Sequence, residues 1–134
     1  PFRKELEHLE DYIVLEKVRF EDRIQFVKEL EVDEFLIPPL VLQPIVENAI
    51  KHGLLRTKKG GTIRLTTKRE DNYILMQIID DGAGFDMELP IRAGAVGINN
   101  VKFRLEYMID GKMEIISAPG KGTTVNIKMP YVVL

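Results

Sequence analysis

The sequence contains no cysteine and carries little net charge. Without cysteine, disulfide bonds and thiolate metal sites are excluded, which is compatible with a reducing compartment. The 19 basic and 21 acidic residues give a formal net charge of -2. This balance argues against the broad cationic surface that nonspecific nucleic-acid binding requires, so any anion-binding site must be local.

The sequence also lacks a long uninterrupted apolar run. The longest apolar stretch, residues 35–46, contains three prolines and one glutamine and is too short to span a bilayer. No internal repeat or low-complexity segment is present, and 134 residues with 45% hydrophobic content suit a single core. The chain begins with Pro1 and has no charged-then-apolar leader, so we expect it to be part of a longer protein.

Hydrophobic periodicity predicts three helices and five strands. Apolar residues spaced three and four apart predict helices over 2–18, 40–52 and 97–109. Alternation predicts strands over 24–32, 62–69, 73–80, 113–117 and 123–129, with the second and third antiparallel and the last two joined by a hairpin turn. Gly53 suits a helix C-cap, and residues 85–96 read as a long loop of the kind that often forms a lid.

A carboxylate stands at the end of the most apolar strand. Asp80 follows this strand and precedes Gly82 and Gly84. A buried carboxylate is costly unless a donor faces it, and the exocyclic amine of adenine is such a donor. The glycines would let a purine ring approach the backbone. A strand that simply ends in an Asp-Gly turn has the same pattern, and that alternative stays open.

Three polar residues border the second predicted helix. The amide oxygen of Asn48 suits a hard cation such as Mg²⁺, and the ammonium of Lys51 suits phosphate. His52 could stack on a nucleotide or hydrogen-bond it. The alternatives are a solvated helix border for the first two, and a favourable helix-dipole partner for the histidine.

Two glycine-rich segments complete the candidate site. Gly97 opens the third helix, whose first backbone N–H groups would face an anion. Thr123 follows the hairpin sequence of residues 118–122 and could bring a hydroxyl toward a base. Hairpins also use these residues for turn geometry alone.

The order of these motifs resembles a known family. Glu-Asn-Ala-x-Lys-His at 47–52, Asp-x-Gly-x-Gly at 80–84 and Gly-x-Gly-Thr at 120–123 resemble the ATP-binding domain shared by gyrase-type topoisomerases, Hsp90 chaperones, sensor histidine kinases and MutL proteins, the GHKL superfamily. Within it, Leu-x-x-Tyr-Ile-x-x-Glu-x-x-Arg-Phe at 9–20 and Ile-Pro-Pro-Leu-x-Leu-Gln-Pro-Ile-Val-Glu-Asn-Ala at 37–49 are similar to histidine kinases of the LytS and YehU type.

The resemblance implies a fold, cofactors and residue roles. The fold is a two-layer α/β sandwich of the α+β class, the Bergerat-type ATP-binding fold, with a mixed, mostly antiparallel sheet and helices on one face. The cofactors are ATP and Mg²⁺. By this resemblance Asn48 would bind the metal, Lys51 the phosphates, and His52 the base or sugar side of the nucleotide. Asp80 would accept a hydrogen bond from the adenine amine, and Gly82 and Gly84 would let the ring approach. Thr123 would form a hydrogen bond near the base.

The resemblance also implies a protein-histidine kinase that acts with other domains. Residues 1–20 would be a helix that continues from a missing dimerisation and phosphoacceptor region, and residues 21–134 the catalytic domain. The partners would be a histidine on that helical domain of the same protein and a response regulator, with no nucleic acid. The full-length protein is expected to be a homodimer with this domain on the cytoplasmic side of a membrane. Because the acceptor lies upstream and His8 lacks the family pattern around it, autophosphorylation is not expected from this chain alone.

Two departures from the family pattern bear on activity. ATP-hydrolysing gyrase-type members carry a glutamate one helical turn before the metal-binding asparagine, and Pro44 stands there in this sequence. Efficient hydrolysis is therefore not expected, and Glu47 is either a candidate base or a helix-surface group. Of the glycines expected before the last helix, only Gly97 is at the expected spacing. The alternatives are a gyrase- or Hsp90-like ATPase module and a degenerate docking domain that binds no nucleotide.

Overall fold

A five-stranded sheet with the spatial order β1-β2-β3-β5-β4 forms one layer of the fold. The computed structural model describes residues 1–20, 23–52, 54, 60–84 and 95–133. Each predicted helix and strand is found. Along the chain the elements are α1 (Phe2–Arg19), β1 (Ile24–Leu30), α2 (Leu42–His52), β2 (Gly61–Glu70), β3 (Tyr73–Asp80), α3 (Ala95–Met108), β4 (Lys112–Ser117) and β5 (Thr123–Pro130).

The sheet is mixed and mostly antiparallel, as predicted. Strands β1 and β2 pair in parallel, whereas β2 with β3, β3 with β5 and β4 with β5 pair antiparallel. Parallel neighbours need a crossover connection, and α2 lies between β1 and β2 in the sequence. The tight turn between β2 and β3 places Asp71 at a φ of 55°, a left-handed conformation that aspartate tolerates.

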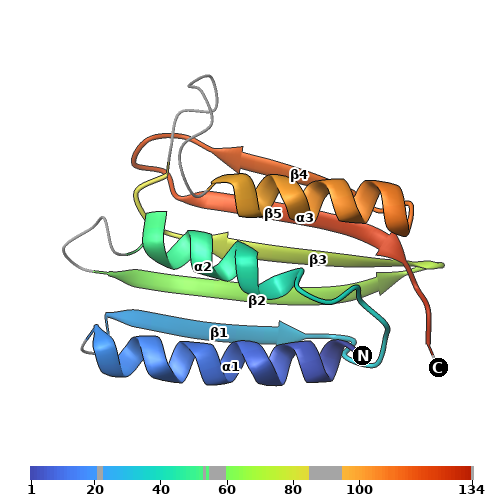
Figure 1. Ribbon diagram of the computed structural model, residues 1–134, viewed down its shortest axis with the longest axis horizontal. Coiled ribbons are helices and arrows are strands. Elements are labelled where there is room, and N and C mark those ends of the chain that lie inside the picture. Colours follow the sequence, from blue (N-terminus) through green and yellow to red (C-terminus); the bar gives the residue numbers. More distant parts are fainter. Residues whose placement is uncertain (21–22, 53, 55–59, 85–94, 134) are drawn as a thin grey trace.

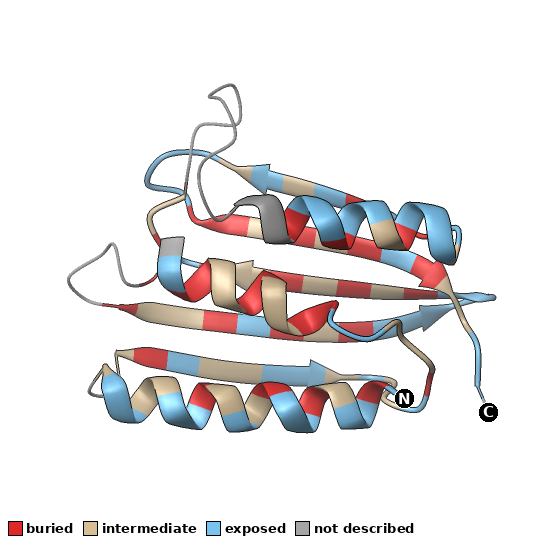
Figure 2. Ribbon diagram, viewed as in Figure 1, coloured by how far each residue is buried: buried red, intermediate tan, exposed pale blue. Residues whose placement is uncertain are grey.

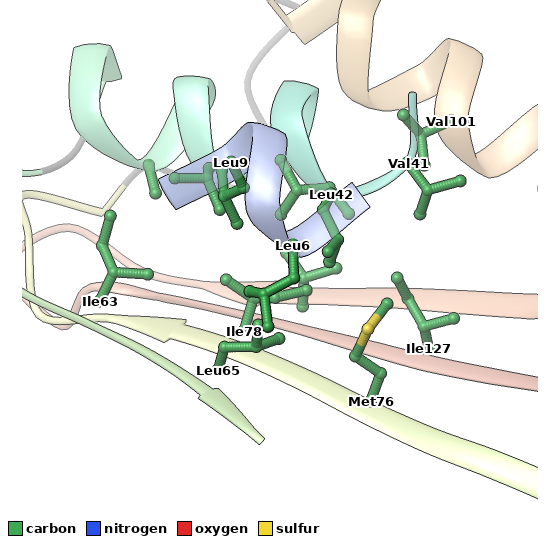
Figure 3. Packing of buried hydrophobic residues seen from close by; sticks show 14 of the residues in the cluster. Leu6, Leu9, Val41, Leu42, Ile63, Leu65, Met76, Ile78, Val101 and Ile127 are labelled. Carbon is green, nitrogen blue, oxygen red and sulfur yellow. The ribbon is translucent and has the colours of Figure 1, made fainter. Parts of the chain in front are cut away.

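All three helices cover one face of the sheet (Figure 1), so the predicted two-layer arrangement is confirmed. Buried positions alternate with more exposed ones along the inner strands (Figure 2), as expected when only one face is covered. Figure 3 shows the resulting core, in which side chains from the helices meet those from the strands. The labelled contributors are Leu6 and Leu9 of α1, Val41 just before α2, Leu42 of α2, Val101 of α3, and Ile63, Leu65, Met76, Ile78 and Ile127 of the sheet.

Helix α1 packs into this same core. Its buried residues recur at helical spacing and are Phe2, Leu6, Leu9 and Ile13. The ring of Phe2 stacks on Phe35, with 4.5 Å between centroids, and Glu10 accepts a hydrogen bond from the ammonium of Lys28 at 3.0 Å. The amphipathic pattern of the N-terminal sequence therefore reflects contact with the rest of the domain.

Helix α2 begins two residues later than predicted. Leu40 has a φ of 59°, which is incompatible with a right-handed helix, so the first turn starts at Leu42. Pro44 then lies in that first turn, where its missing N–H is not needed. The predicted core stripe of this helix is confirmed, because Leu42, Ile45, Val46, Ala49 and Ile50 are all buried. Gly53, the predicted C-cap, lies outside the described residues.

Helix α3 begins at Ala95, two residues before the predicted start. The predicted loop over 85–96 was therefore too long at its end, and residues 85–94 lie outside the described part of the chain. Met108, expected on the apolar side, is 66% exposed, and Ile109 packs against the core instead. The helix ends at Met108, and the chain turns at Asp110, where φ is 54°. Among the described helices, none combines the length and apolar composition needed to cross a membrane.

Candidate nucleotide-binding site

The predicted site residues come from elements that meet at one end of the molecule. Figure 1 shows that β3 and α2 end at the same end of the sheet at which β5 and α3 begin. Asp80 and Thr123 are direct register partners in the pairing of β3 with β5. Asn48 and Lys51 lie in the second half of α2, which packs against β3. The topology therefore places the elements that carry the predicted residues at one end of the sheet.

Asp80 is a buried carboxylate whose charge is only partly compensated. It is 5% exposed, and its Oδ1 accepts a hydrogen bond from the backbone N–H of Gly82 at 2.9 Å. Burial raises the pKa of Asp80 from 3.8 to about 6, against the lowering effect of backbone donors from Gly82 and Thr123, while Asp81 raises it further. A further donor at this carboxylate, such as an adenine amine, would relieve the cost of its burial.

Thr123 is buried beside Asp80, and its hydroxyl already has a partner. The Ser117 hydroxyl donates to the carbonyl of Gly122 at 2.9 Å, and its oxygen lies 2.9 Å from Thr123 Oγ1. Because Ser117 has a single hydroxyl proton, Thr123 must donate in this second bond. The Thr123 oxygen is then available to a nucleotide as an acceptor only. Sequence reasoning did not identify Ser117, although a serine and a threonine flanking a hairpin turn commonly pair across the strands.

Gly84 is explained by contact with the β4–β5 hairpin turn. Its φ is 66°, and a Cβ there would overlap the carbonyl oxygen of Ala118 and lie 3.0 Å from that of Gly122. The N–H of Gly120 donates to the carbonyl of Ala83 at 2.7 Å, which ties the turn to the segment after β3. Backbone packing alone therefore requires this glycine. The predicted role of Gly84 in admitting a purine ring stays a prediction.

Helix α2 carries Asn48, the predicted metal ligand, and Lys51, the predicted phosphate partner. Asn48 is half-buried and Lys51 is exposed, while the side chain of His52 lies outside the described part of the chain. The described residues include no group of three or more histidine, cysteine, aspartate or glutamate side chains that could hold a metal ion. The amide oxygen of Asn48 is a neutral donor of the kind that Mg²⁺ accepts beside waters and substrate phosphates, so its predicted role as a metal ligand stays a prediction.

Pro44 and Glu47 precede Asn48 on α2. Both are half-buried, and Glu47 Oε1 accepts a hydrogen bond from Gln43 Nε2 at 3.0 Å. Pro44 lies four residues before Asn48 and therefore shares its face of the helix. It has no group that can activate water.

The last predicted residue, Gly97, lies in the first turn of α3. The preceding residues 85–94, predicted as a lid, lie outside the described residues, so an anion site at this helix start stays a prediction. The sequence did not predict one further contact, which lies next to Asp80. The carboxylate of Asp81 accepts the backbone N–H of Thr62 at 2.8 Å, which fixes the start of β2 beside the end of β3.

Comparison with known proteins identifies the family. The sequence profile of the histidine kinase-, DNA gyrase B- and HSP90-like ATPases matches residues 38–133. The chain belongs to this family. The predicted site residues, from Glu47 to Thr123, all lie within the matched range. Helix α1 precedes this range.

Two relatives and one solved structure refine the comparison. The chain is 32% identical to sensor protein LytS of Oceanobacillus iheyensis over 148 aligned positions, covering 98% of this chain and 25% of LytS. It is 31% identical to sensor histidine kinase BtsS of Escherichia coli (strain K12) over 131 positions, covering 95% and 23%. The catalytic domain of histidine kinase ThkA superposes with a TM-score of 0.73 at 16% identity, covering 99% and 95%, which shows a shared fold. The chain spans less than half the length of the curated relatives it matches.

Proposed function

We propose that this chain binds Mg²⁺ and ATP and donates the γ-phosphate to a histidine on a separate helical domain of the same protein. The observation that carries the proposal is Asp80, a buried carboxylate at a strand end whose two backbone donors do not offset its burial. Such a group is costly to the folded chain, and an adenine amine would complete its hydrogen bonding. Membership of the ATPase family supports the same ligand.

In this proposal the nucleotide extends from Asp80 toward α2. Asp80 accepts the adenine amine, and the Thr123 oxygen accepts a hydrogen bond near the base. Asn48 supplies a neutral oxygen to Mg²⁺, which neutralises phosphate charge when bound, and Lys51 pairs with the phosphates. His52 lies on the base or sugar side, and Gly82, Gly84 and Gly97 bring backbone close to the ligand.

Pro44 favours transfer to a protein over hydrolysis. Phosphoryl transfer depends mainly on positioning and charge neutralisation, so a site that lacks a water-activating base can still present a phosphoryl group to a stronger nucleophile. We further propose a homodimeric, membrane-associated sensor kinase in which this domain is cytoplasmic, α1 continues from the acceptor region, and a response regulator receives the phosphoryl group. The sensor kinases among the relatives support this architecture.

Equilibrium titration with Mg²⁺ and a nonhydrolysable ATP analogue tests the proposal. We expect saturable binding to this chain and steady-state phosphate release from ATP close to the uncatalysed background. Absence of saturable binding at millimolar analogue would contradict the nucleotide site and favour a docking domain. Sustained phosphate release would instead indicate an ATPase module of the gyrase or Hsp90 kind.

Replacing Lys51 by alanine should weaken the binding of the ATP analogue more than the binding of adenosine. An exposed ammonium that meets phosphate contributes a partly screened ion pair, so we expect about fivefold weaker analogue binding, or ~1 kcal/mol, and unchanged adenosine binding. Lys68→Ala removes an exposed lysine from β2 and serves as the matched control. If the binding of adenosine and the binding of the analogue weaken equally, Lys51 supports the fold and does not contact phosphate.

A further inference from the structure

A small open cavity with both polar and apolar lining lies between α2 and α3, on the helical side of the molecule. Its volume is about 250 Å³, slightly below the usual range of small-ligand pockets, ~300 to 1,000 Å³. This size suits a single side chain better than a nucleotide. The residues that line it are Leu40, Gln43, Pro44, Glu47, Asn100 and Arg104.

The cavity opens close to the proposed metal ligand. Pro44 is in its wall, and Asn48 lies one helical turn further along the same face of α2. Glu47, also in the wall, directly precedes Asn48 in the sequence. A group inside the cavity would therefore lie about one helical turn from a metal ion held at Asn48.

The wall of the cavity offers an oriented carboxylate. Gln43 donates to Oε1 of Glu47 at 3.0 Å, which fixes the carboxyl group and leaves Oε2 as an acceptor. Arg104 lines the same cavity, yet its guanidinium donates to the carbonyls of Pro39, at 2.7 Å, and Leu40. Among the described residues, no ion pair joins Arg104 or another cation to Glu47. Within the described part of the chain, Oε2 of Glu47 can therefore accept a hydrogen bond from a group that enters the cavity.

The rim of the cavity is apolar and held in place. Leu40 is 59% exposed, and its backbone is fixed from two sides. Its N–H donates to Glu5 of α1 at 2.8 Å, and its carbonyl accepts from Arg104 of α3. An exposed leucine with a fixed backbone, beside a cavity that holds a carboxylate, suits contact with a protein partner that inserts one polar side chain.

We propose that this cavity receives the imidazole ring of the phosphoacceptor histidine and that Glu47 accepts the proton which the ring loses on phosphorylation. This inference rests on the proposed function. One ring nitrogen uses its lone pair to form the bond to the γ-phosphorus while the bond to the bridging oxygen breaks, and ADP leaves with that electron pair. The phosphorylated ring is cationic, and the N–H of its other nitrogen passes its proton to Glu47, which later releases it to water.

Imidazole itself is the probe, because the acceptor domain is not part of this chain. Amide-resolved NMR of the chain, saturated with Mg²⁺ and the nonhydrolysable ATP analogue at pH 8, is followed during an imidazole titration. We expect saturable shifts of the side-chain amide resonances of Gln43 and Asn100. Glu47→Gln keeps the shape of the side chain and should lower the affinity for imidazole about tenfold, because a neutral acceptor replaces a charged one.

Glu106→Gln, at an exposed glutamate of α3 that does not line the cavity, is the matched control and should leave imidazole binding unchanged. If the analogue binds but imidazole shifts no cavity resonance, or shifts them equally in Glu47→Gln, the cavity inference is overturned and the nucleotide site stands. If the analogue itself does not bind, the proposed function fails together with the inference.

Discussion

Replacing Asp80 by asparagine is expected to remove most nucleotide affinity while making the folded chain harder to unfold at neutral pH. The loss of a charge-assisted hydrogen bond in a buried pocket costs about 1.5 to 3 kcal/mol, or roughly tenfold or more in affinity. The gain in stability follows from the burial of the carboxylate, which raises its pKa to about 6. A residue placed only for stability would not combine these two effects.

The pH dependence of this gain has a defined sign. Because the folded state holds the Asp80 proton up to a pKa of about 6 and the unfolded state only to 3.8, ionisation favours unfolding. The stabilising effect of the protonated acid is complete below pH 4 and is lost as the pH rises through 6. At ~1.36 kcal/mol per pKa unit, the difference in unfolding free energy between Asp80→Asn and the original chain should rise by roughly 2 to 2.5 kcal/mol from pH 4 to pH 7. Urea denaturation at several pH values measures it.

Asp81→Asn is the matched control for this measurement. Asp81 is exposed and accepts one backbone N–H from Thr62, a bond that the asparagine oxygen can still accept. Because Asp81 only adds to the raised pKa of Asp80, we expect a much smaller change in stability from Asp81→Asn than from Asp80→Asn. An Asp80→Asn variant that is destabilised equally at every pH, and that binds the analogue as before, would show that the carboxylate serves the fold and not a ligand.

The fold was predictable because its periodic patterns are strong and mutually consistent. The core stripe of α2 and the alternation in β3 each bury one face, so helical and strand periods identify the elements directly. The starts of α2 and α3 were harder to predict from the sequence. The left-handed conformation of Leu40 reflects contacts with Glu5 and Arg104, residues far away in the sequence, and local pattern does not encode such contacts.

The candidate site was predictable as a set of residues but not as a set of contacts. The carboxylate of Asp80 and its neighbouring glycines are visible in the sequence as a strand end followed by a turn. That Thr123 donates its proton to Ser117, and that Gly84 packs on the turn after β4, depends on the pairing of β5 with both β3 and β4. Long-range strand pairing decides which polar atoms remain for a ligand, and a single sequence does not state it.

Adding one methyl group at Gly84 is expected to be among the most destabilising single changes in this chain. Alanine would have to adopt a φ of 66° and its Cβ would overlap the carbonyl oxygen of Ala118. The left-handed conformation costs ~1 to 2 kcal/mol and overpacking a further ~1 to 3 kcal/mol, which together approach the whole stability of a small domain. Thermal and urea unfolding of Gly84→Ala measure this cost.

Gly120→Ala separates conformational strain from collision. Gly120 has a φ of 77°, yet a Cβ there meets nothing within 4 Å. The variant should therefore lose only ~1 kcal/mol, because the left-handed cost is partly offset by lower entropy of the unfolded chain. Equal, small losses in both variants would contradict the hairpin contact as the reason for Gly84. A Gly84→Ala variant that stays stable but no longer binds the analogue would return this glycine to the ligand, because only an approaching purine would then need the space.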